Sequence, residues 1–263
     1  MMPENREFVG LKKHTHDDRT KIIRNGIVPV LTQELGDNLI AIAADGSYAR
    51  NEDAEYSDLE LMIFVKDKKD LPFGFSRIVD GMLIEGIYIT EDEYYRTVIE
   101  PNPEWFISGS DTLHAITNPQ YIEKIKCYKV EDLTEKCRAY VHEMLPEMQE
   151  SFAKLFMAID RKNIENIFPI LFYALHSVLK LMAFINRIPY KTLGSFITQS
   201  RMFKNKPAGF DDFLDVIVDG TYRDLPLLKQ RSAVLYADIE AYLEKVEKAP
   251  LYDGDLSTIT KRK

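Results

Sequence analysis

A glycine-serine pair early in the chain has the pattern of a phosphate-binding turn. Gly46 and Ser47 follow the apolar run of residues 39–44, which predicts a buried strand. A sharp turn at this point directs successive backbone N–H groups and the Ser47 hydroxyl at one phosphate. Arg50, three residues further on, adds a positive charge. An ordinary turn would have the same two residues, so their meaning depends on what lies nearby.

Three carboxylates on the next apolar runs have the chemistry of a metal site. Asp58 and Glu60 are one residue apart at the start of the run 58–65, so on a strand both emerge on the same face. Glu85 interrupts the apolar run 82–89. Hard oxygen ligands of this kind suit Mg²⁺, which takes its other ligands from water and substrate phosphates. A solvated sheet edge is the alternative, but a phosphate turn beside metal-binding carboxylates indicates nucleotidyl transfer.

The elements that would position these residues are segregated along the chain. Strands are expected at 39–44, 58–65 and 82–89, after a helix at 17–35 whose N-cap is Thr15 or Asp17. Helical periodicity then covers residues 133–158, 164–185, 193–203, 213–218 and 225–246. The sequence therefore predicts an α+β protein. Its N-terminal domain, residues 1–128, has a mixed sheet with flanking helices, and residues 129–263 form an all-helical domain.

Composition limits the class of partner. The chain has 263 residues and a net charge of −8, which repels a nucleic-acid backbone and favours a cationic small molecule. Cys127 and Cys137 fit neither a disulfide framework nor a zinc site, which favours a reducing cytoplasm. The polar N-terminus has no signal-peptide pattern, and the apolar stretch 168–185 contains Pro169, His176 and Lys180. We therefore expect a cytoplasmic protein with no nucleic-acid or membrane partner.

Two short motifs carry a family resemblance. Residues 46–50, Gly-Ser-Tyr-Ala-Arg, and 56–60, Tyr-Ser-Asp-Leu-Glu, resemble the nucleotidyltransferase fold of polymerase-beta-like enzymes. Along most of its length the chain looks like the kanamycin nucleotidyltransferase family, the aminoglycoside 4'-O-nucleotidyltransferases, including the C-terminal motifs at 186–190 and 207–210. The resemblance implies transfer of AMP from Mg-ATP to a hydroxyl of an aminoglycoside, with release of pyrophosphate. It also implies antibiotic resistance, and a homodimer in which one subunit's helical domain helps build the other's active site.

The resemblance also implies roles for individual residues. The triphosphate would be held by Gly46, Ser47, Arg50, Ser57 and Lys154. Mg²⁺ would be bound by Asp58, Glu60 and Glu85, of which Asp58 and Glu60 are also catalytic. Glu150 would be the general base, one helical turn before Lys154, and residues four apart on a helix share a face. An exposed Glu-Lys ion pair is the alternative for these two.

The acceptor and the activity itself leave alternatives open. Likeness to the family weakens over residues 105–109, so a lincosamide or another small hydroxylated metabolite could replace the aminoglycoside. Tyr94, Tyr95 and Trp105 fit either an acceptor pocket or internal packing. A non-catalytic nucleotide-binding or dimerisation module is the third alternative. The retained carboxylates argue against it, because unpaired acids near apolar residues are costly to keep.

Overall fold

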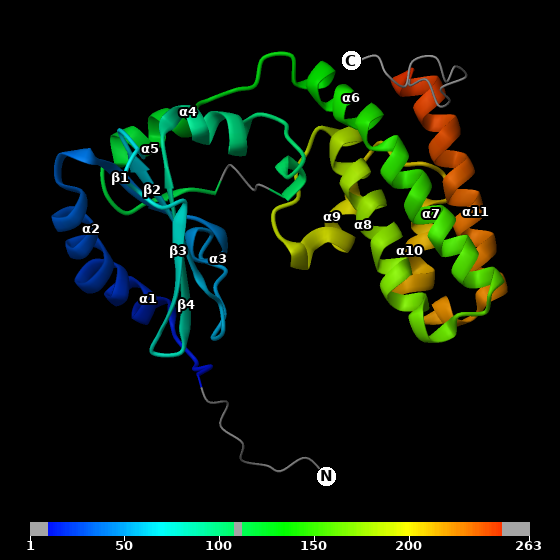
Figure 1. The fold of residues 1–263 in the computed structure, drawn as a ribbon, viewed down its shortest axis with the longest axis horizontal. Coiled ribbons are helices and arrows are strands. Elements are labelled where there is room, and N and C mark those ends of the chain that lie inside the picture. Colours follow the sequence, from blue (N-terminus) through cyan, green and yellow to red (C-terminus); the bar gives the residue numbers. More distant parts are fainter. Residues whose placement is uncertain (1–9, 108–111, 249–263) are drawn as a thin grey trace, which may run out of the picture. The chain divides into compact units, whose positions relative to one another are not determined.

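The computed structural model describes residues 10–107 and 112–248 (Figure 1). Contacts along the chain divide it into two compact units. The first unit lies within residues 1–100 and 108–131, and the second within residues 101–107 and 132–263. The short segment 101–107 therefore packs with the helices that follow it in sequence, and each unit is described by itself below.

A five-stranded mixed sheet forms the centre of the first unit. Its strands are β1 (Leu39–Ala44), β2 (Leu59–Val65), β3 (Gly74–Val79), β4 (Met82–Ile89) and β5 (His114–Ala115). The spatial order is β3-β4-β2-β1-β5, in which β2 and β4 are parallel and the other neighbours are antiparallel. The predicted strands at 39–44 and 82–89 are confirmed, and the predicted strand at 58–65 begins one residue later. The α+β class with a mixed sheet is confirmed as well.

The edge strand β3 is absent from the sequence-based prediction. Most of its side chains are exposed, so it lacks an apolar run. Its signal is the Asp80-Gly81 pair, which joins β3 to β4 in a two-residue hairpin. Both residues have positive φ, 49° and 78°, as a type I′ turn requires. The turn chemistry therefore predicts this strand better than its hydrophobicity does.

Helices cover both faces of the sheet (Figure 1). One layer contains α1 (His16–Ile22), a π-helical turn (Ile23–Ile27) and α2 (Val28–Leu35); the other contains α4 (Glu91–Tyr94) and α5 (Pro119–Lys126). α1 begins after Thr15, whose side chain and that of Asp18 form a capping box. Of the two predicted N-caps, Thr15 is confirmed. Helix α5 was not expected in the segment before residue 128.

The described part of the second unit consists of helices and the segments that connect them, without a strand. The α-helices are α6 (Leu133–Glu143), α7 (Leu145–Asp160), α8 (Ile167–Asn186), α9 (Phe196–Met202), α10 (Phe210–Val218) and α11 (Leu225–Tyr242). The single helix expected at 133–158 is divided in two at Met144, and Pro146 lies in the first turn of α7, where its missing N–H costs nothing. The predicted helical half is confirmed.

Helix α8 is the central element of the hydrophobic core of the second unit. The segment Ile164–Asn186 is long and apolar enough to cross a membrane by length and composition alone. However, 61% of its most apolar window is buried among the other helices, and core helices commonly pass the same test. Most of the side chains of α8 from Leu171 to Ile185 are buried. The structure therefore uses α8 as a packing element.

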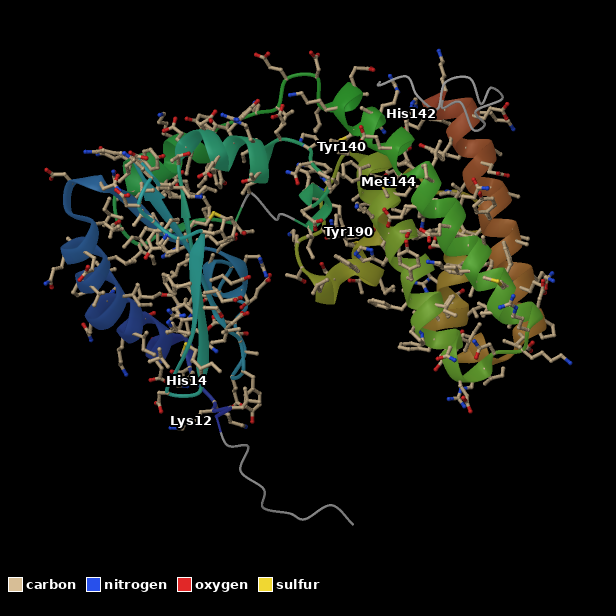
Figure 2. All side chains as sticks on the ribbon, viewed as in Figure 1. Lys12, His14, Tyr140, His142, Met144 and Tyr190 are labelled. Carbon is tan, nitrogen blue, oxygen red and sulfur yellow. The ribbon has the colours of Figure 1, made fainter. Side chains whose placement is uncertain are left out.

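Tyr190, which is fully buried, attaches the segment 101–107 to the helical unit (Figure 2). Its backbone N–H donates to the Phe106 carbonyl at 2.7 Å, and its hydroxyl donates to the Leu179 carbonyl at 3.0 Å. Trp105, 4% exposed, packs against Phe184 with 5.5 Å between ring centroids. Packing, rather than an acceptor pocket, therefore explains Trp105.

Candidate functional site

The glycine-serine turn lies at the carboxyl end of strand β1. Asp45 caps the single helical turn α3 (Gly46–Ala49) by accepting a hydrogen bond from the Gly46 N–H at 2.7 Å. The Asp45 carboxylate also accepts from the Thr112 hydroxyl at 2.7 Å. Gly46 has φ +66°, a left-handed conformation that glycine adopts without strain. The strand-turn-helix geometry expected from the sequence is therefore present, with Ser47 in the helical turn.

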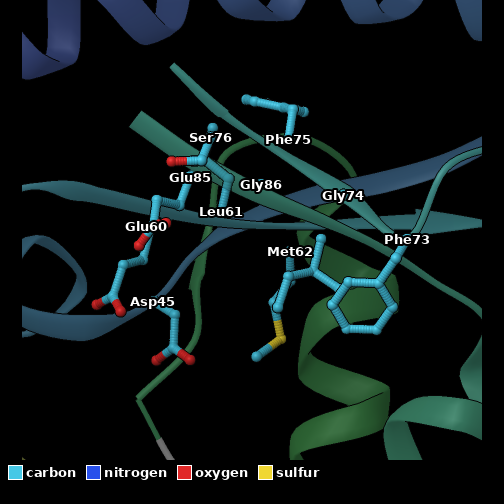
Figure 3. A pocket seen from close by; sticks show the side chains of 11 residues that line it. Asp45, Glu60, Leu61, Met62, Phe73, Gly74, Phe75, Ser76, Glu85 and Gly86 are labelled. Atoms are coloured by element: carbon cyan, nitrogen blue, oxygen red, sulfur yellow. The ribbon is translucent and has the colours of Figure 1, made fainter. Parts of the chain in front are cut away.

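Glu60 and Glu85 lie side by side across the parallel strands β2 and β4. They are register partners, and Ser76 on β3 is the register partner of Glu85, so the three residues form a row across three strands. Figure 3 shows the side chains of Asp45, Glu60 and Glu85 at one end of a pocket on this face. Residues before and after Glu60 on β2, Leu59 and Leu61, are buried on the opposite face. The alternation predicted from the sequence is thus what positions the carboxylates.

The carboxylates repel one another. Partial burial, and next the charges of Asp58, Asp45 and Glu85, raise the pKa of Glu60 from 4.5 to about 7, while Arg50 acts in the opposite direction. Solvent also reaches Glu60, so part of the repulsion is screened. A carboxyl group with a raised pKa among other acids is typical of functional sites. A cation bound among these carboxylates would reduce the repulsion between them.

The donor set fits a divalent cation in its chemistry. Carboxylate oxygens are the ligands that Mg²⁺ prefers, and Asp58, Glu60 and Glu85 supply them within one unit. In residues 10–107 and 112–248, no three His, Cys, Asp or Glu side chains converge closely enough to hold a metal ion. Like charges favour rotamers that diverge, so convergence is expected only when a cation is present. Asp58, Glu60 and Glu85 stay the predicted ligands.

A cavity of about 460 Å³ extends from the carboxylates over the sheet (Figure 3). It is lined by Asp45, Glu60, Leu61, Met62, Phe73, Gly74, Phe75, Ser76, Glu85, Gly86 and Ile87. Acids lie at one end, whereas Met62 and the exposed Phe73 lie at the other. The cavity therefore offers a charged end and an apolar end to a small molecule.

We expect Glu60→Gln to raise the melting temperature more at pH 8 than at pH 5. A carboxyl group whose pKa is higher in the folded protein than in the unfolded chain binds more protons when folded, so its ionisation lowers stability. For Glu60 this loss develops between about pH 4.5 and pH 7 and is complete above it. Glutamine carries no charge and avoids the loss. Thermal unfolding at both pH values checks the prediction, with the exposed Glu123→Gln as control; equal shifts at the two pH values would contradict it.

We expect Gly46→Ala to cost both stability and metal binding. An added Cβ would lie 1.8 Å from Glu60 Oε2, so the carboxylate must move. The left-handed backbone costs a further 1–2 kcal/mol, roughly, for any residue with a side chain. Gly220, φ +69°, is the matched control because its added Cβ would meet nothing within 4 Å. Calorimetric titration should show weaker Mn²⁺ binding for Gly46→Ala and wild-type binding for Gly220→Ala. Equal binding in the two variants would contradict the role of Gly46.

Two further predicted ligands of the triphosphate, Arg50 and Ser57, differ in their surroundings. Arg50 caps the C-terminus of α3, its side chain is 10% exposed, and its Nε donates to Glu52 at 2.7 Å. The Ser57 hydroxyl accepts a hydrogen bond from the Ala54 N–H at 2.9 Å, so it holds its own loop. Arg50 lies near the carboxylates, whereas the visible role of Ser57 is local.

Glu150 and Lys154 lie on α7, in the second unit. They form an ion pair at 2.7 Å, and both side chains are about half exposed, 57% and 49%. The Lys154 ammonium group also lies 5.4 Å from the centre of the Tyr173 ring. A hydrogen bond from Lys154, and then its charge, hold the pKa of Glu150 below its usual value. The geometry fits a surface ion pair and equally a carboxylate that is ionised at neutral pH, as a general base must be.

Sequence reasoning missed Asp45 and the apolar end of the cavity. Asp45 directly precedes Gly46 at a strand end, which is a typical N-cap position and could have identified it. Tyr94 is fully buried against Phe64, with ring centroids 5.4 Å apart, and Tyr95 packs on Tyr128 at 6.0 Å. Tyr94 therefore packs internally and Tyr95 packs partly buried beside it, and neither lines the cavity.

Comparisons with known proteins agree with this geometry. Residues 121–248 match the model of the KNTase C-terminal domain. A solved structure, the nucleotidyltransferase-like protein from Exiguobacterium sibiricum 255-15, is similar over 86% of this chain and 77% of its own, with a TM-score of 0.53 and 12% identity. This second likeness concerns the fold alone. No curated protein matches the chain at a significant level. The helical half of the chain therefore matches the C-terminal domain of the kanamycin nucleotidyltransferase family, and this match supports a nucleotidyltransferase.

Proposed function

We propose that this protein transfers AMP from Mg-ATP to a hydroxyl group of an aminoglycoside. One observation carries the proposal: the Gly46-Ser47 turn lies directly against the carboxylate row, since an added Cβ on Gly46 would meet Glu60. A triphosphate held at the turn would bring its α-phosphate next to carboxylates able to hold a divalent cation. The match to the family's C-terminal domain supports a nucleotide substrate and a divalent metal, and the finer assignment to ATP, Mg²⁺ and an aminoglycoside is our proposal.

At the α-phosphorus the reaction forms one bond and breaks one, and a proton leaves the acceptor hydroxyl. The acceptor oxygen attacks the α-phosphorus of ATP, the bond from that phosphorus to the oxygen bridging the β-phosphate breaks, and pyrophosphate leaves. Mg²⁺ held by Asp58, Glu60 and Glu85 would neutralise charge on the phosphates. Arg50 and the backbone of the turn would orient the triphosphate, Lys154 would contact a phosphate, and Glu150 would take the proton of the acceptor hydroxyl.

The cavity beside the carboxylates is the proposed acceptor site. An aminoglycoside has several ammonium groups, and the acidic end formed by Asp45, Glu60 and Glu85 attracts positive charge. The net charge of −8 favours the same class of molecule over a nucleic acid. We further propose a cytoplasmic location, a homodimer, and antibiotic modification as the biological role.

The apolar end of the cavity favours a second candidate acceptor. Met62, Phe73 and Ile87 present carbon to the site, and a polyhydroxylated aminoglycoside uses such a surface poorly. A lincosamide or another hydroxylated small molecule with an apolar group would use it better. The nucleotidyl transfer would be unchanged, because the cradle and the carboxylates are the same for both acceptors.

Mass spectrometry of the reaction products tests the proposal. The purified protein is incubated with Mg-ATP and a panel of aminoglycosides and lincosamides, while pyrophosphate release is followed in parallel. We expect an aminoglycoside heavier by one AMP, and the product's fragmentation identifies the modified hydroxyl. Adenylylation of a lincosamide alone would replace the acceptor and keep the reaction. Absence of product and pyrophosphate with every acceptor and nucleoside triphosphate would contradict the proposed transfer and favour the non-catalytic module.

A further inference from the structure

A buried arginine on α1 lies beneath the loop that leads to Asp58. Arg19 is 0% exposed, and its guanidinium donates to the carbonyl groups of His14, Ala54 and Ser57 at 3.0, 2.9 and 2.6 Å. It also donates to Asp53 Oδ2 at 3.0 Å. A buried charge is retained only when it is paired and hydrogen-bonded, and Arg19 meets both conditions through residues of the segment 51–57.

Two other residues on the same face of α1 contact the glycine-serine turn. His16 stacks on Tyr48 of α3, with ring centroids 4.4 Å apart and planes 9° apart. The Thr20 hydroxyl lies 2.8 Å from the Tyr48 hydroxyl. His16 Nδ1 also lies 2.7 Å from Asp53 Oδ1. Asp53 therefore joins the contacts of Arg19 to those of His16 and Thr20 in one network. One helix face therefore contacts both α3 and the loop 51–57.

This network connects two parts of the nucleotide site that the chain itself joins only by a loop. Ser47 is at the predicted triphosphate cradle, and Asp58, a predicted metal ligand, follows the carbonyl of Ser57 that Arg19 binds twice. The loop has few regular hydrogen bonds of its own: Asn51 and Glu52 donate back to α3, while Ala54 and Ser57 bond to each other. Strand pairing holds the turn beside Glu60, because the Asp45 N–H donates to the Glu60 carbonyl at 2.9 Å, whereas the loop that ends at Asp58 is held mainly by contacts from α1 and from His14 just before it.

We propose that the α1 face of His16, Arg19 and Thr20 holds the loop 51–57 and α3 together and so fixes Asp58 relative to the triphosphate cradle, with Arg19 as the positioning residue for Asp58. The inference rests on the proposed function. Arg19 touches neither nucleotide nor metal in this role. Its planar fork makes bonds to three carbonyls and one carboxylate, a set that the single ammonium group of lysine does not reproduce. Asp53, 2% exposed at its side chain, connects Arg19 to His16.

The test compares Arg19→Met, Arg19→Lys and the isosteric Asp53→Asn in the full-length protein. Arg187→Met is the matched control, because Arg187 is also a mostly buried arginine, paired with Glu247 at 3.1 Å in the helical unit. Titration with Mn²⁺ in the presence of a non-hydrolysable ATP analogue gives a dissociation constant without any acceptor. Hydrogen exchange at the amides of residues 46–58 reports on the loop and on α3.

We expect Arg19→Met to raise the Mn²⁺ dissociation constant at least tenfold and to accelerate exchange across residues 51–57. Arg19→Lys should lose several-fold, Asp53→Asn should lose less, and Arg187→Met should lower the melting temperature without either change. Asp53→Asn decides the matter if the Arg19 variants do not fold. Wild-type binding and exchange in the Asp53 variant, or in folded Arg19 variants, would overturn the proposal. Failure of the wild-type protein to bind Mn²⁺ with the analogue would instead overturn the proposed function. The two failures are distinguishable because this one is seen in the wild-type protein alone.

Discussion

Asp58→Asn is expected to abolish nucleotidyl transfer and leave the fold intact. Asp58 lies just before β2, is partly exposed, and is one of the charges that raise the pKa of Glu60. Asparagine keeps its shape but loses the charge that a metal ligand needs. Charge stabilisation by a metal is worth several kcal/mol at the transition state, so the rate should fall at least about 10³-fold. Pyrophosphate release measures the rate, and thermal unfolding measures the stability.

Two readouts separate loss of the metal from loss of structure. The control is Asp92→Asn, which removes an exposed acid of the same unit, paired with Arg96 on the surface. It should retain wild-type turnover. Asp58→Asn should also lower the pKa of Glu60, because Asp58 is the first of the charges that raise it. Wild-type turnover in the Asp58 variant would remove Asp58 from the metal site.

Glu150→Gln is expected to lower the catalytic rate by about 10² to 10⁴ fold, the usual contribution of a general base. Nucleotide binding should be largely retained, because Glu150 acts on the acceptor hydroxyl in the proposed reaction. The hydrogen bond and charge of Lys154 keep the pKa of Glu150 low, so the carboxylate is already ionised at neutral pH. Turnover at saturating ATP and acceptor, with ATP-analogue binding measured separately, checks both parts.

The surface ion pair is the competing explanation for Glu150. Its exposure of 57% means that solvent screens the pair, and exposed pairs contribute little to stability. Glu150→Gln should therefore change the melting temperature very little under either explanation, so only the rate is decisive. Glu143→Gln, an exposed acid at the end of α6, is the control. An unchanged rate in Glu150→Gln would leave the residue as a surface ion pair and the general base unassigned.

Local sequence signals predicted several elements to within a residue. Strands β1 and β4 are bounded by changes in hydropathy that depend only on neighbouring residues, and the N-cap of α1 at Thr15 depends on a side chain three residues away. β3 was missed because an exposed edge strand has no apolar run, although its Asp80-Gly81 turn was visible. The continuous helix expected at 133–158 was wrong because helical periodicity persists across the break at Met144.

Some features of the candidate site could also be predicted from local sequence signals. From the sequence alone came the order of its parts: a glycine-serine turn after a buried strand, then Asp58 and Glu60 on one face of a strand, then Glu85 on another. Alternation with a period of two fixes which side chains share a face, and it needs no knowledge of partners. Glu60 and Glu85 could therefore be chosen before their strands were known to be neighbours.

Only the tertiary structure decided what these parts meet. The parallel register of β2 and β4 places Glu60 beside Glu85. Burial, and then the charges of Asp58, Asp45 and Glu85, raise the pKa of Glu60, and Asp45 is a residue that sequence spacing did not single out. The burial of Arg19 beneath the loop 51–57 was equally hidden, because arginine on a helix is usually exposed. Register and burial depend on hydrogen bonds and packing between segments distant in sequence. The sequence pattern shows which side chains share one face of a helix or strand. Which faces pack against each other is decided only in the folded molecule.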